Sequence, residues 1–273
     1  FWGLAGLKAA GRIVENQSMK RRQDIAAEEK DFEDCIFESI QNIPAHRSQG
    51  GIPATPYRRM DAGAIGSMVA DYPLQLTESM DERIRHTMEF LIHNCFYQGA
   101  FFQDMIHSGI NIYLTLAIAQ TLLRREDARY REMIQVAADL ASATGQWPEA
   151  VHPQTKGGCM GDGQHGWAAA EWIMMIRNLF VREEGDSLVL GAGIFPEWLK
   201  PEKTVGFGPT PTPYGNVALQ ARAGDSALTV YLDIDWKKDG PVPKEMVLAI
   251  PGYSHYSVPD FSQQTFTLER ANT

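Results

Sequence analysis

The sequence predicts a mainly α-helical fold built from repeated helical hairpins, followed by a small β-rich domain. Three observations predict it. Segments with a one-sided apolar stripe alternate with segments that are apolar nearly all round, the connections between them alternate between short and long, and the helical pattern ends near residue 184. At 273 residues the chain is long enough for a large core or for two domains.

Three segments carry apolar residues on one side only and are predicted to be helices with one face in water. They are Arg22–Ile43, Asp81–Cys95 and Asp127–Leu140. In the second of them, Ile84, Met88 and Leu91 recur at intervals of three and four residues, which is the spacing of one helix face.

Four other segments are apolar nearly all round and are predicted to be helices buried by other helices. They are Phe1–Val14, Ala62–Tyr72, Ser108–Leu123 and Gly166–Val181. These inner helices recur about every 50 residues and alternate with the amphipathic ones, which indicates a helical-hairpin repeat.

The connections that lead into the inner helices are long and rich in Gly, Pro, Trp and His. They span residues 44–61, 96–107 and 143–165. In a ring of hairpins these loops emerge at one end, and functional residues collect on loops held by a rigid scaffold. That end is therefore the candidate active face.

After Glu184 the pattern changes to short strand-like runs separated by turn signals, such as Gly224-Asp225 and Asp239-Gly240. We therefore expect a boundary near residue 185. It separates a helical part, 1–184, from a β-rich C-terminal domain, 185–273, that carries no catalytic signature of its own.

Composition excludes several classes of partner and cofactor. The net charge of −9 argues against nucleic acid and anionic membranes, and no apolar run approaches the roughly 20 residues of a membrane span. The three cysteines lie far apart and form neither a disulfide framework nor a zinc motif, so we expect no metal and no cofactor. The chain starts at Phe1 without a methionine, so its native start is expected upstream. The compartment stays open, although the cysteine usage is compatible with the cytoplasm.

The third long loop contains the strongest candidate for catalysis. Prolines and a glycine rule out a regular helix in the stretch GQWPEAVHP, residues 145–153. There Glu149 is the candidate general base, Trp147 a candidate stacking surface for a sugar ring, and His152 a hydrogen-bond partner. The glycine-rich continuation adds further candidate sugar ligands: Asp162, Gln164 and His165. The alternative is an ordinary structured surface turn.

The first two long loops carry further candidates. Asp61 starts an inner helix, where it is predicted to bind sugar hydroxyls or to act as the acid; the alternative is an N-cap that faces the helix dipole. Arg58 and Arg59 are predicted to clamp sugar or carboxylate groups, or simply to pair with Asp61 or Asp71. The second loop adds a polar group beside aromatic residues: Gln103, Asp104 and His107.

Three motifs resemble the six-hairpin glycosidases, the (α/α)6-barrel superfamily that includes glucoamylases, trehalases and α-L-rhamnosidases. They are GQWPEAVHP at 145–153, GDGQHGWAAAEW at 161–172 and RRMDAGAIG at 58–66. The resemblance covers about residues 1–200. It implies an (α/α)6 toroid in which the helices of this chain are the sixth to the twelfth, with Glu149 as the general base before the twelfth. It also implies a general acid upstream of Phe1 and a missing N-terminal half of the barrel.

The function expected from these features is an inverting glycoside hydrolase that acts on a carbohydrate substrate without a cofactor. Glu149 would deprotonate the attacking water while an acid across the cleft protonates the leaving oxygen. Three alternatives stay open: a disaccharide phosphorylase, in which phosphate replaces the water; a sugar epimerase that relies on histidine pairs; and a non-catalytic carbohydrate-binding scaffold.

Overall fold

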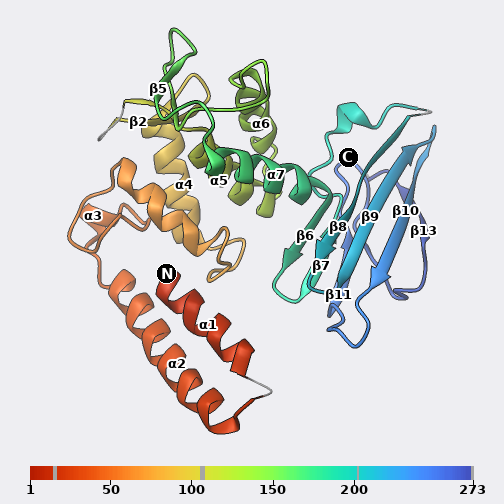
Figure 1. The fold of residues 1–273 in the computed structure, drawn as a ribbon, viewed down its shortest axis with the longest axis horizontal. Helices are drawn as coiled ribbons and strands as arrows, with labels where there is room; N and C mark the ends of the chain where they lie inside the picture. Colours follow the sequence, from red (N-terminus) through yellow and green to blue (C-terminus); the bar gives the residue numbers. More distant parts are fainter. Residues whose placement is uncertain (15–16, 105–107, 202, 272–273) are drawn as a thin grey trace. The chain divides into compact units, whose positions relative to one another are not determined.

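The computed structural model describes residues 1–14, 17–104, 108–201 and 203–271. The chain forms two compact units, each made of two chain segments (Figure 1). Unit 1 comprises Phe1–Thr121 and Glu132–Ala168, and unit 2 comprises Leu122–Arg131 and Ala169–Thr273. The boundary expected near residue 185 stays a prediction.

Unit 1 contains most of the helices. Those that lie wholly within it are α1 (Trp2–Val14), α2 (Met19–Gln41), α3 (Ala45–Ser48), the 3-10 helix η1 (Ala62–Ala70) and α4 (Glu82–Cys95). Helices α5 (Ile112–Arg124), α6 (Tyr130–Asp139) and α7 (Gly166–Phe180) have residues in both units. In α4 the buried residues include Ile84, Met88 and Leu91, the stripe that its spacing predicts.

A small five-stranded sheet also belongs to unit 1, and its strand order follows the chain. Its strands are β1 (Phe96–Tyr97), β2 (Ala100–Gln103), β3 (Gly109–Ile110), β4 (Ala150–Val151) and β5 (Gly158–Met160). Each neighbouring pair is antiparallel. The sheet therefore joins the second and third long loops of the sequence, although the whole of α5 and α6 lies between β3 and β4 along the chain.

Unit 2 contains the other two sheets, each of four strands. One has the order β13-β10-β9-β8, from β8 (Thr204–Thr212), β9 (Gly215–Ala223), β10 (Ala227–Trp236) and β13 (Thr265–Glu269). The other has the order β12-β11-β7-β6, and its strands are β6 (Val181–Glu184), β7 (Ser187–Leu190), β11 (Glu245–Leu248) and β12 (Tyr256–Ser257). The short 3-10 helix η2 (Pro196–Trp198) follows β7 along the chain. In β9 the buried residues Val217, Leu219 and Ala221 alternate with more exposed ones, as in a strand with one face in a core.

The expectation of a mainly α-helical (α/α)6 toroid is wrong. The structure is 39% helical and 23% strand, and the described residues form three sheets. Parts of the second and third long loops pair with the first residues of the inner helix expected over Ser108–Leu123, and together they form β1 to β5. This pairing satisfies backbone N–H and C=O groups that buried loops cannot leave unpaired. In addition, the inner helix expected over Ala62–Tyr72 forms a 3-10 helix instead.

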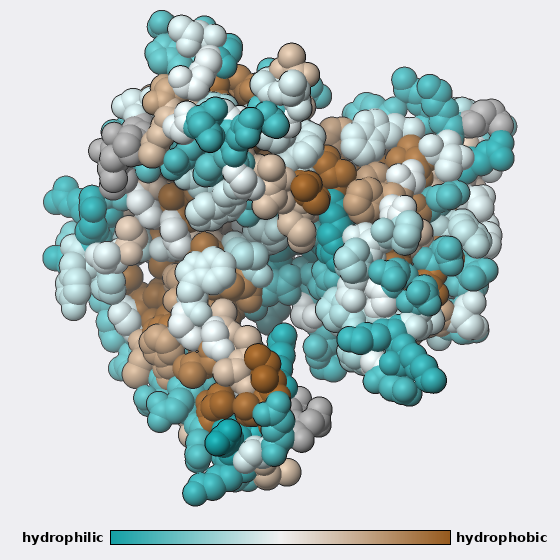
Figure 2. Space-filling model, viewed as in Figure 1, coloured by the Kyte–Doolittle hydropathy of each residue, from teal (hydrophilic) through white to brown (hydrophobic). Residues whose placement is uncertain are grey.

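The expectation that inner helices are buried on all sides also fails at the N-terminus. Trp2 and Ile13 of α1 are 60% and 69% exposed. The apolar stripe of the amphipathic helix expected over Arg22–Ile43 is not fully buried either, because α2, described along its full length, has no buried residue. Figure 2 shows hydrophobic side chains gathered over this pair of helices. The apolar composition of a helix indicates that its surface favours burial, but it does not identify the element that covers that surface.

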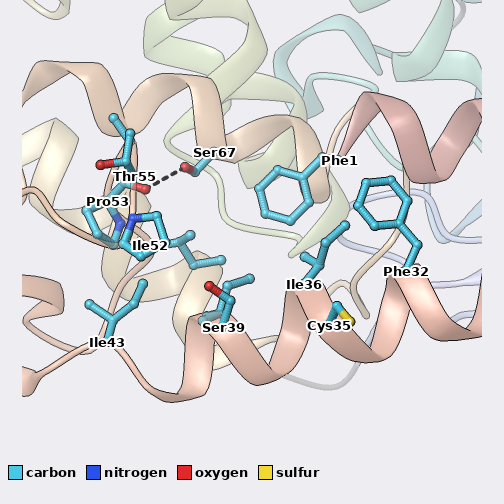
Figure 3. A pocket seen from close by; sticks show the side chains of 13 residues that line it. Phe1, Phe32, Cys35, Ile36, Ser39, Ile43, Ile52, Pro53, Thr55 and Ser67 are labelled. Atoms are coloured by element: carbon cyan, nitrogen blue, oxygen red, sulfur yellow. Dashed lines mark hydrogen bonds between the residues drawn. The ribbon is translucent and has the colours of Figure 1, made fainter.

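An apolar cleft of about 310 Å³ lies in unit 1 between α1, α2 and residues 52–56 (Figure 3). Phe1, Phe32 and Ile36 contribute to its walls, and the hydroxyl of Ser67 donates a hydrogen bond to the carbonyl oxygen of Pro53 (3.0 Å) at its edge. None of the expected site residues that the structure describes lines this cleft.

No helix within the described part of the chain has both the length and the apolar character needed to cross a membrane.

Candidate active site

The small sheet of unit 1 pairs the strand that follows Glu149 with β3 and β5, and β3 pairs in turn with β2. Glu149 directly precedes β4, in which Val151 is paired with Ile110 of β3 and Ala150 with Met160 of β5. Gln103, at the end of β2, is paired with Gly109 of β3. The sheet thus brings Gln103 and the loop of Glu149 into one small region.

The backbone of Glu149 is fixed from two sides. The side-chain Nδ2 of Asn111 donates a hydrogen bond to the carbonyl oxygen of Glu149 (2.8 Å). On the other side Gly161 lies so close that an added Cβ would be 3.2 Å from the backbone nitrogen of Glu149. Gly161 also has a φ of +79°, which a residue with a side chain rarely adopts. Asn111 and Gly161 therefore restrict the backbone that carries the Glu149 side chain.

An aromatic group lies next to this carboxylate. The pKa of Tyr113 is raised, first by its burial and then by the negative charge of Glu149. The ring of Tyr113 contacts those of His165 and Trp167, with ring centroids 4.9 and 4.7 Å apart. Trp167 is 56% exposed. A half-buried carboxylate thus lies near an aromatic surface that is open to solvent.

Sequence reasoning missed three of these residues. Asn111 directly precedes α5 and Tyr113 lies in its first turn, in a segment expected to be buried on all sides. Trp167 is the second residue of α7, which was expected to be buried in the same way. The useful signal was the position of Trp167 directly after the glycine-rich stretch that carries Asp162, Gln164 and His165. An aromatic residue at the mouth of a long loop is more exposed than one in the middle of a helix.

The structure corrects the role expected of Trp147. Its indole is only 3% exposed, and its Nε1 donates a hydrogen bond to the backbone carbonyl of Ala137 (2.8 Å). A buried indole needs such an acceptor, and this one anchors the loop to α6. Trp147 is therefore a core residue and offers no face to a sugar ring.

The other polar residues of the third loop mainly stabilise its backbone. Nδ1 of His152 accepts hydrogen bonds from the backbone N–H groups of residues 154 and 155 (3.3 and 3.2 Å). Asp162 accepts one from the backbone of Gln164 (2.9 Å), whose side chain is exposed. His165 donates its backbone N–H to the carbonyl of Trp147 (2.8 Å), while its Nδ1 accepts from the backbone of Ala168 (3.4 Å). Of these residues, His165 has the ring contact with Tyr113 described above.

Asp61 and its neighbours form a second group. Asp61 accepts the backbone N–H of Gly63 (2.9 Å) as the N-cap of η1, and its other oxygen pairs with Nη2 of Arg58 (2.7 Å). Burial raises the pKa of Cys95 to about 11, with smaller contributions from the charges of Asp104 and Asp61, so both carboxylates lie around this thiol. Arg59 is exposed, and His107 lies outside the described residues.

The described residues include no group of three His, Cys, Asp or Glu side chains placed to hold a metal ion. The groups that the structure places around Glu149 are the amide of Asn111, the phenol of Tyr113 and the backbone at Gly161.

Comparison with family models and with curated proteins finds no match. Among solved structures, a glycosidase variant with a single substitution matches with a TM-score of 0.51 and 16% sequence identity, over 64% of this chain and 49% of that chain. The structure named "Glycosidase Wild Type" matches with the same identity and coverage and a TM-score of 0.49. The chain thus spans about half the length of these structures. The first match shows a similar fold over about two thirds of the chain.

Proposed function

We propose that this chain carries part of the active site of a glycoside hydrolase, with Glu149 as the general base of an inverting reaction. The observation that carries the proposal is the position of Glu149, whose backbone carbonyl is held by Asn111, near the half-buried Tyr113 and the exposed ring of Trp167. The similarity of the fold to a solved glycosidase supports it. The substrate is then a carbohydrate.

In the proposed reaction the carboxylate of Glu149 takes a proton from a water molecule, whose oxygen attacks the anomeric carbon. A second carboxyl group protonates the leaving oxygen, and inversion requires the two groups to be roughly 6.5–9.5 Å apart. Both oxygens of Asp61 already accept hydrogen bonds from other groups. Asp61 therefore suits the binding of sugar hydroxyls better than the delivery of a proton.

The aromatic surface has a separate task in this proposal. A pyranose presents C–H groups on one face, which pack against an aromatic ring and lose contact with water. Trp167 and Tyr113 would hold the sugar ring in place, and Gln103 and His165 would orient its hydroxyls. The epimerase alternative receives less support, because Nδ1 atoms of both His152 and His165 accept backbone hydrogen bonds.

The test uses α- and β-D-glycosyl fluorides as substrates, because fluoride leaves with little help from an acid and the reaction then reports on the base. Release of fluoride gives the rate, and proton NMR gives the anomer of the first product. Replacement of Glu149 by Gln should lower kcat by roughly 10²–10⁴. Glu132→Gln is the matched control, because Glu132 is an exposed glutamate of the same unit.

Three results distinguish the possibilities. Inverted product and a strong loss in Glu149→Gln support the proposal. Retained product, or turnover of the variant within a few fold of wild type, contradicts the assigned role of Glu149. Binding of sugars without turnover in the wild-type protein favours the non-catalytic scaffold instead.

A further inference from the structure

A second cavity, of about 210 Å³, lies entirely within unit 2. Three chain segments wall it: the turn over residues 126–131, the loop that follows β7 at Ala192, and the loop over residues 249–255 that follows β11. Its lining includes Glu126, Arg131 and His255. Since Glu149 belongs to unit 1, this cavity is a different site from the candidate active site.

The topology of the sheet explains why these loops meet. Strands β7 and β11 are parallel and in register, with Leu190 opposite Leu248, so the loops that follow them leave the same edge of the sheet. Gly191 allows the close approach, because its φ is +74° and an added Cβ would be 2.6 Å from the side chain of Ile250.

Two ion-pair contacts of residues that line this cavity, one of them with Glu197 outside the lining, are too wide to be direct hydrogen bonds. Nε2 of His255 is 3.7 Å from Oε2 of Glu126, and Nη1 of Arg131 is 3.7 Å from Oε1 of Glu197. Hydrogen bonds between N–H and O have lengths of about 2.7–3.2 Å, so each pair keeps unused donor and acceptor capacity. Among the residues that line the cavity, the carboxylate of Glu126 and the guanidinium of Arg131 carry opposite charges, which disfavours a charged ligand relative to a neutral one.

A hydroxyl group fits between Glu126 and His255, because it accepts a hydrogen bond from an imidazole N–H and donates one to the carboxylate. The wall that carries Glu126 is also held in place. The hydroxyl of the buried Tyr130 donates to the carbonyl oxygen of Gly193 (3.2 Å), and burial raises the pKa of Tyr130 to about 12, so that it keeps this proton. Glu126 itself has a φ of +57°, a conformation that residues other than glycine keep at a cost.

We propose that this cavity is a second carbohydrate site, which binds one sugar ring as a neutral ligand with its hydroxyls between His255 and Glu126 and beside Arg131. The volume is below the roughly 300–1,000 Å³ of pockets for drug-sized ligands, which favours a single ring over an oligosaccharide. The site does not depend on hydrolysis at Glu149.

The experiment titrates the protein with D-glucose, D-galactose, D-mannose and myo-inositol, and separately with inorganic phosphate as a charged probe. Binding is followed by saturation-transfer NMR and by the ring proton signals of His255 in the wild-type protein. We expect at least one neutral probe to bind with a Kd of order millimolar and to shift the His255 signals. Replacement of Glu126 by Gln together with His255 by Ala should weaken this binding by about tenfold or more.

Two controls separate this proposal from the candidate active site. Asp186→Asn alters an exposed carboxylate that pairs with Lys244 (2.6 Å) in the same unit, and Glu149→Gln alters the other site. Both should leave the affinity within about twofold of wild type. The proposal is overturned if no neutral probe binds up to about 50 mM, if phosphate binds in preference to all of them, or if binding is lost in Glu149→Gln but kept in the double variant. Glu126 and His255 are exposed, so their replacement does not threaten folding.

Discussion

At the scale of single residues, Asn111 determines how firmly Glu149 is held. Its side chain is 3% exposed, its Nδ2 bonds to the carbonyl oxygen of Glu149, and its Oδ1 has no hydrogen-bond partner within the described ranges. We predict that Asn111→Ala lowers the free energy of unfolding by about 1–3 kcal/mol, because it leaves that carbonyl buried and unpaired. It should also lower kcat on the glycosyl fluorides, since Glu149 loses its support.

The control for this prediction is Asn94→Ala. Asn94 makes the same kind of bond, to the carbonyl oxygen of Phe90 (2.8 Å), but it is exposed. Denaturant unfolding and fluoride release are measured for both variants. Equal stability and equal activity of the two would mean that Asn111 has no special role at Glu149.

The aromatic surface allows a second prediction at this scale. Trp167 is mostly exposed, so Trp167→Ala should change the stability of the protein little while it removes a packing face for the sugar. We expect KM to rise by about tenfold with a smaller change in kcat. Tyr57→Ala is the control, because Tyr57 is an 84% exposed aromatic residue elsewhere in the same unit. A similar KM for the two variants would exclude Trp167 from substrate binding.

The two tryptophans also show what sequence cannot predict about single residues. The proline-flanked loop around Trp147 is visible in the sequence, and so is the carboxylate two positions later. Which indole faces water depends on whether a backbone acceptor lies within reach of its N–H. Ala137 supplies that acceptor for Trp147, and this contact depends on the packing of α6 and not on the loop itself.

At the scale of elements, the N-cap of α4 gives a prediction with a pH dependence. Asp81 accepts the backbone N–H of Arg83 (2.8 Å) and pairs with its guanidinium. Burial alone would raise the pKa of Asp81, but the hydrogen bonds from Arg83 outweigh it, and the pKa lies below its ordinary value. The stabilisation by the ionised carboxylate is therefore complete above the ordinary pKa of about 4 and is lost as the pH falls through the lower pKa of the folded state.

Asp81→Ala should accordingly cost about 1 kcal/mol at neutral pH, and the difference from wild type should shrink as the pH falls below about 4. Asp81→Asn keeps an acceptor at the N-cap and loses only the charge, so its cost should be smaller. Urea unfolding at two pH values checks both. A difference between wild type and Asp81→Ala that is independent of pH would contradict the prediction.

Elements with a clear apolar period were the most predictable part of the fold. The stripe of α4 is buried as expected, because one repeated spacing fixes one face of a helix. The strands β1 to β5 were missed, because each is only two to four residues long and is stabilised by distant partners such as Ile110 and Val151. A pattern of two residues has no period that sequence reasoning can detect.

At the scale of the whole molecule, both compact units are discontinuous along the chain. Leu122–Arg131 belongs to unit 2 although it joins two helices, and contacts such as that of Tyr130 with Gly193 hold it there. The hydropathy of a segment reports its own composition and not its neighbours in space. For the same reason the alternation of inner and outer helices predicted a toroid that the chain does not form.

An ion-pair cluster also connects that segment to the rest of unit 2. Glu184, at the end of β6, pairs with Arg124 and with Arg182 (2.6 Å), whose side chains are only 4% and 7% exposed. Burial lowers the pKa of Arg182, although the charge of Glu184 partly offsets this effect. The charge of Glu184 therefore compensates two buried guanidinium groups that are 58 residues apart in the chain, and the charge of Glu126 adds to this for Arg182.

We predict that Glu184→Gln destabilises unit 2 by about 3–5 kcal/mol, because both arginines stay buried without their counter-charge. Asp186→Asn, which removes the carboxylate of an exposed pair two residues away, should cost less than about 1 kcal/mol. In calorimetry the melting temperature of one transition should be lower for Glu184→Gln than for wild type. The triple replacement Arg124→Met, Arg182→Met and Glu184→Leu should recover most of the lost melting temperature, because the three charges of the cluster are removed together. If the triple variant is no more stable than Glu184→Gln alone, the cluster contributes through its hydrogen bonds and not through charge compensation.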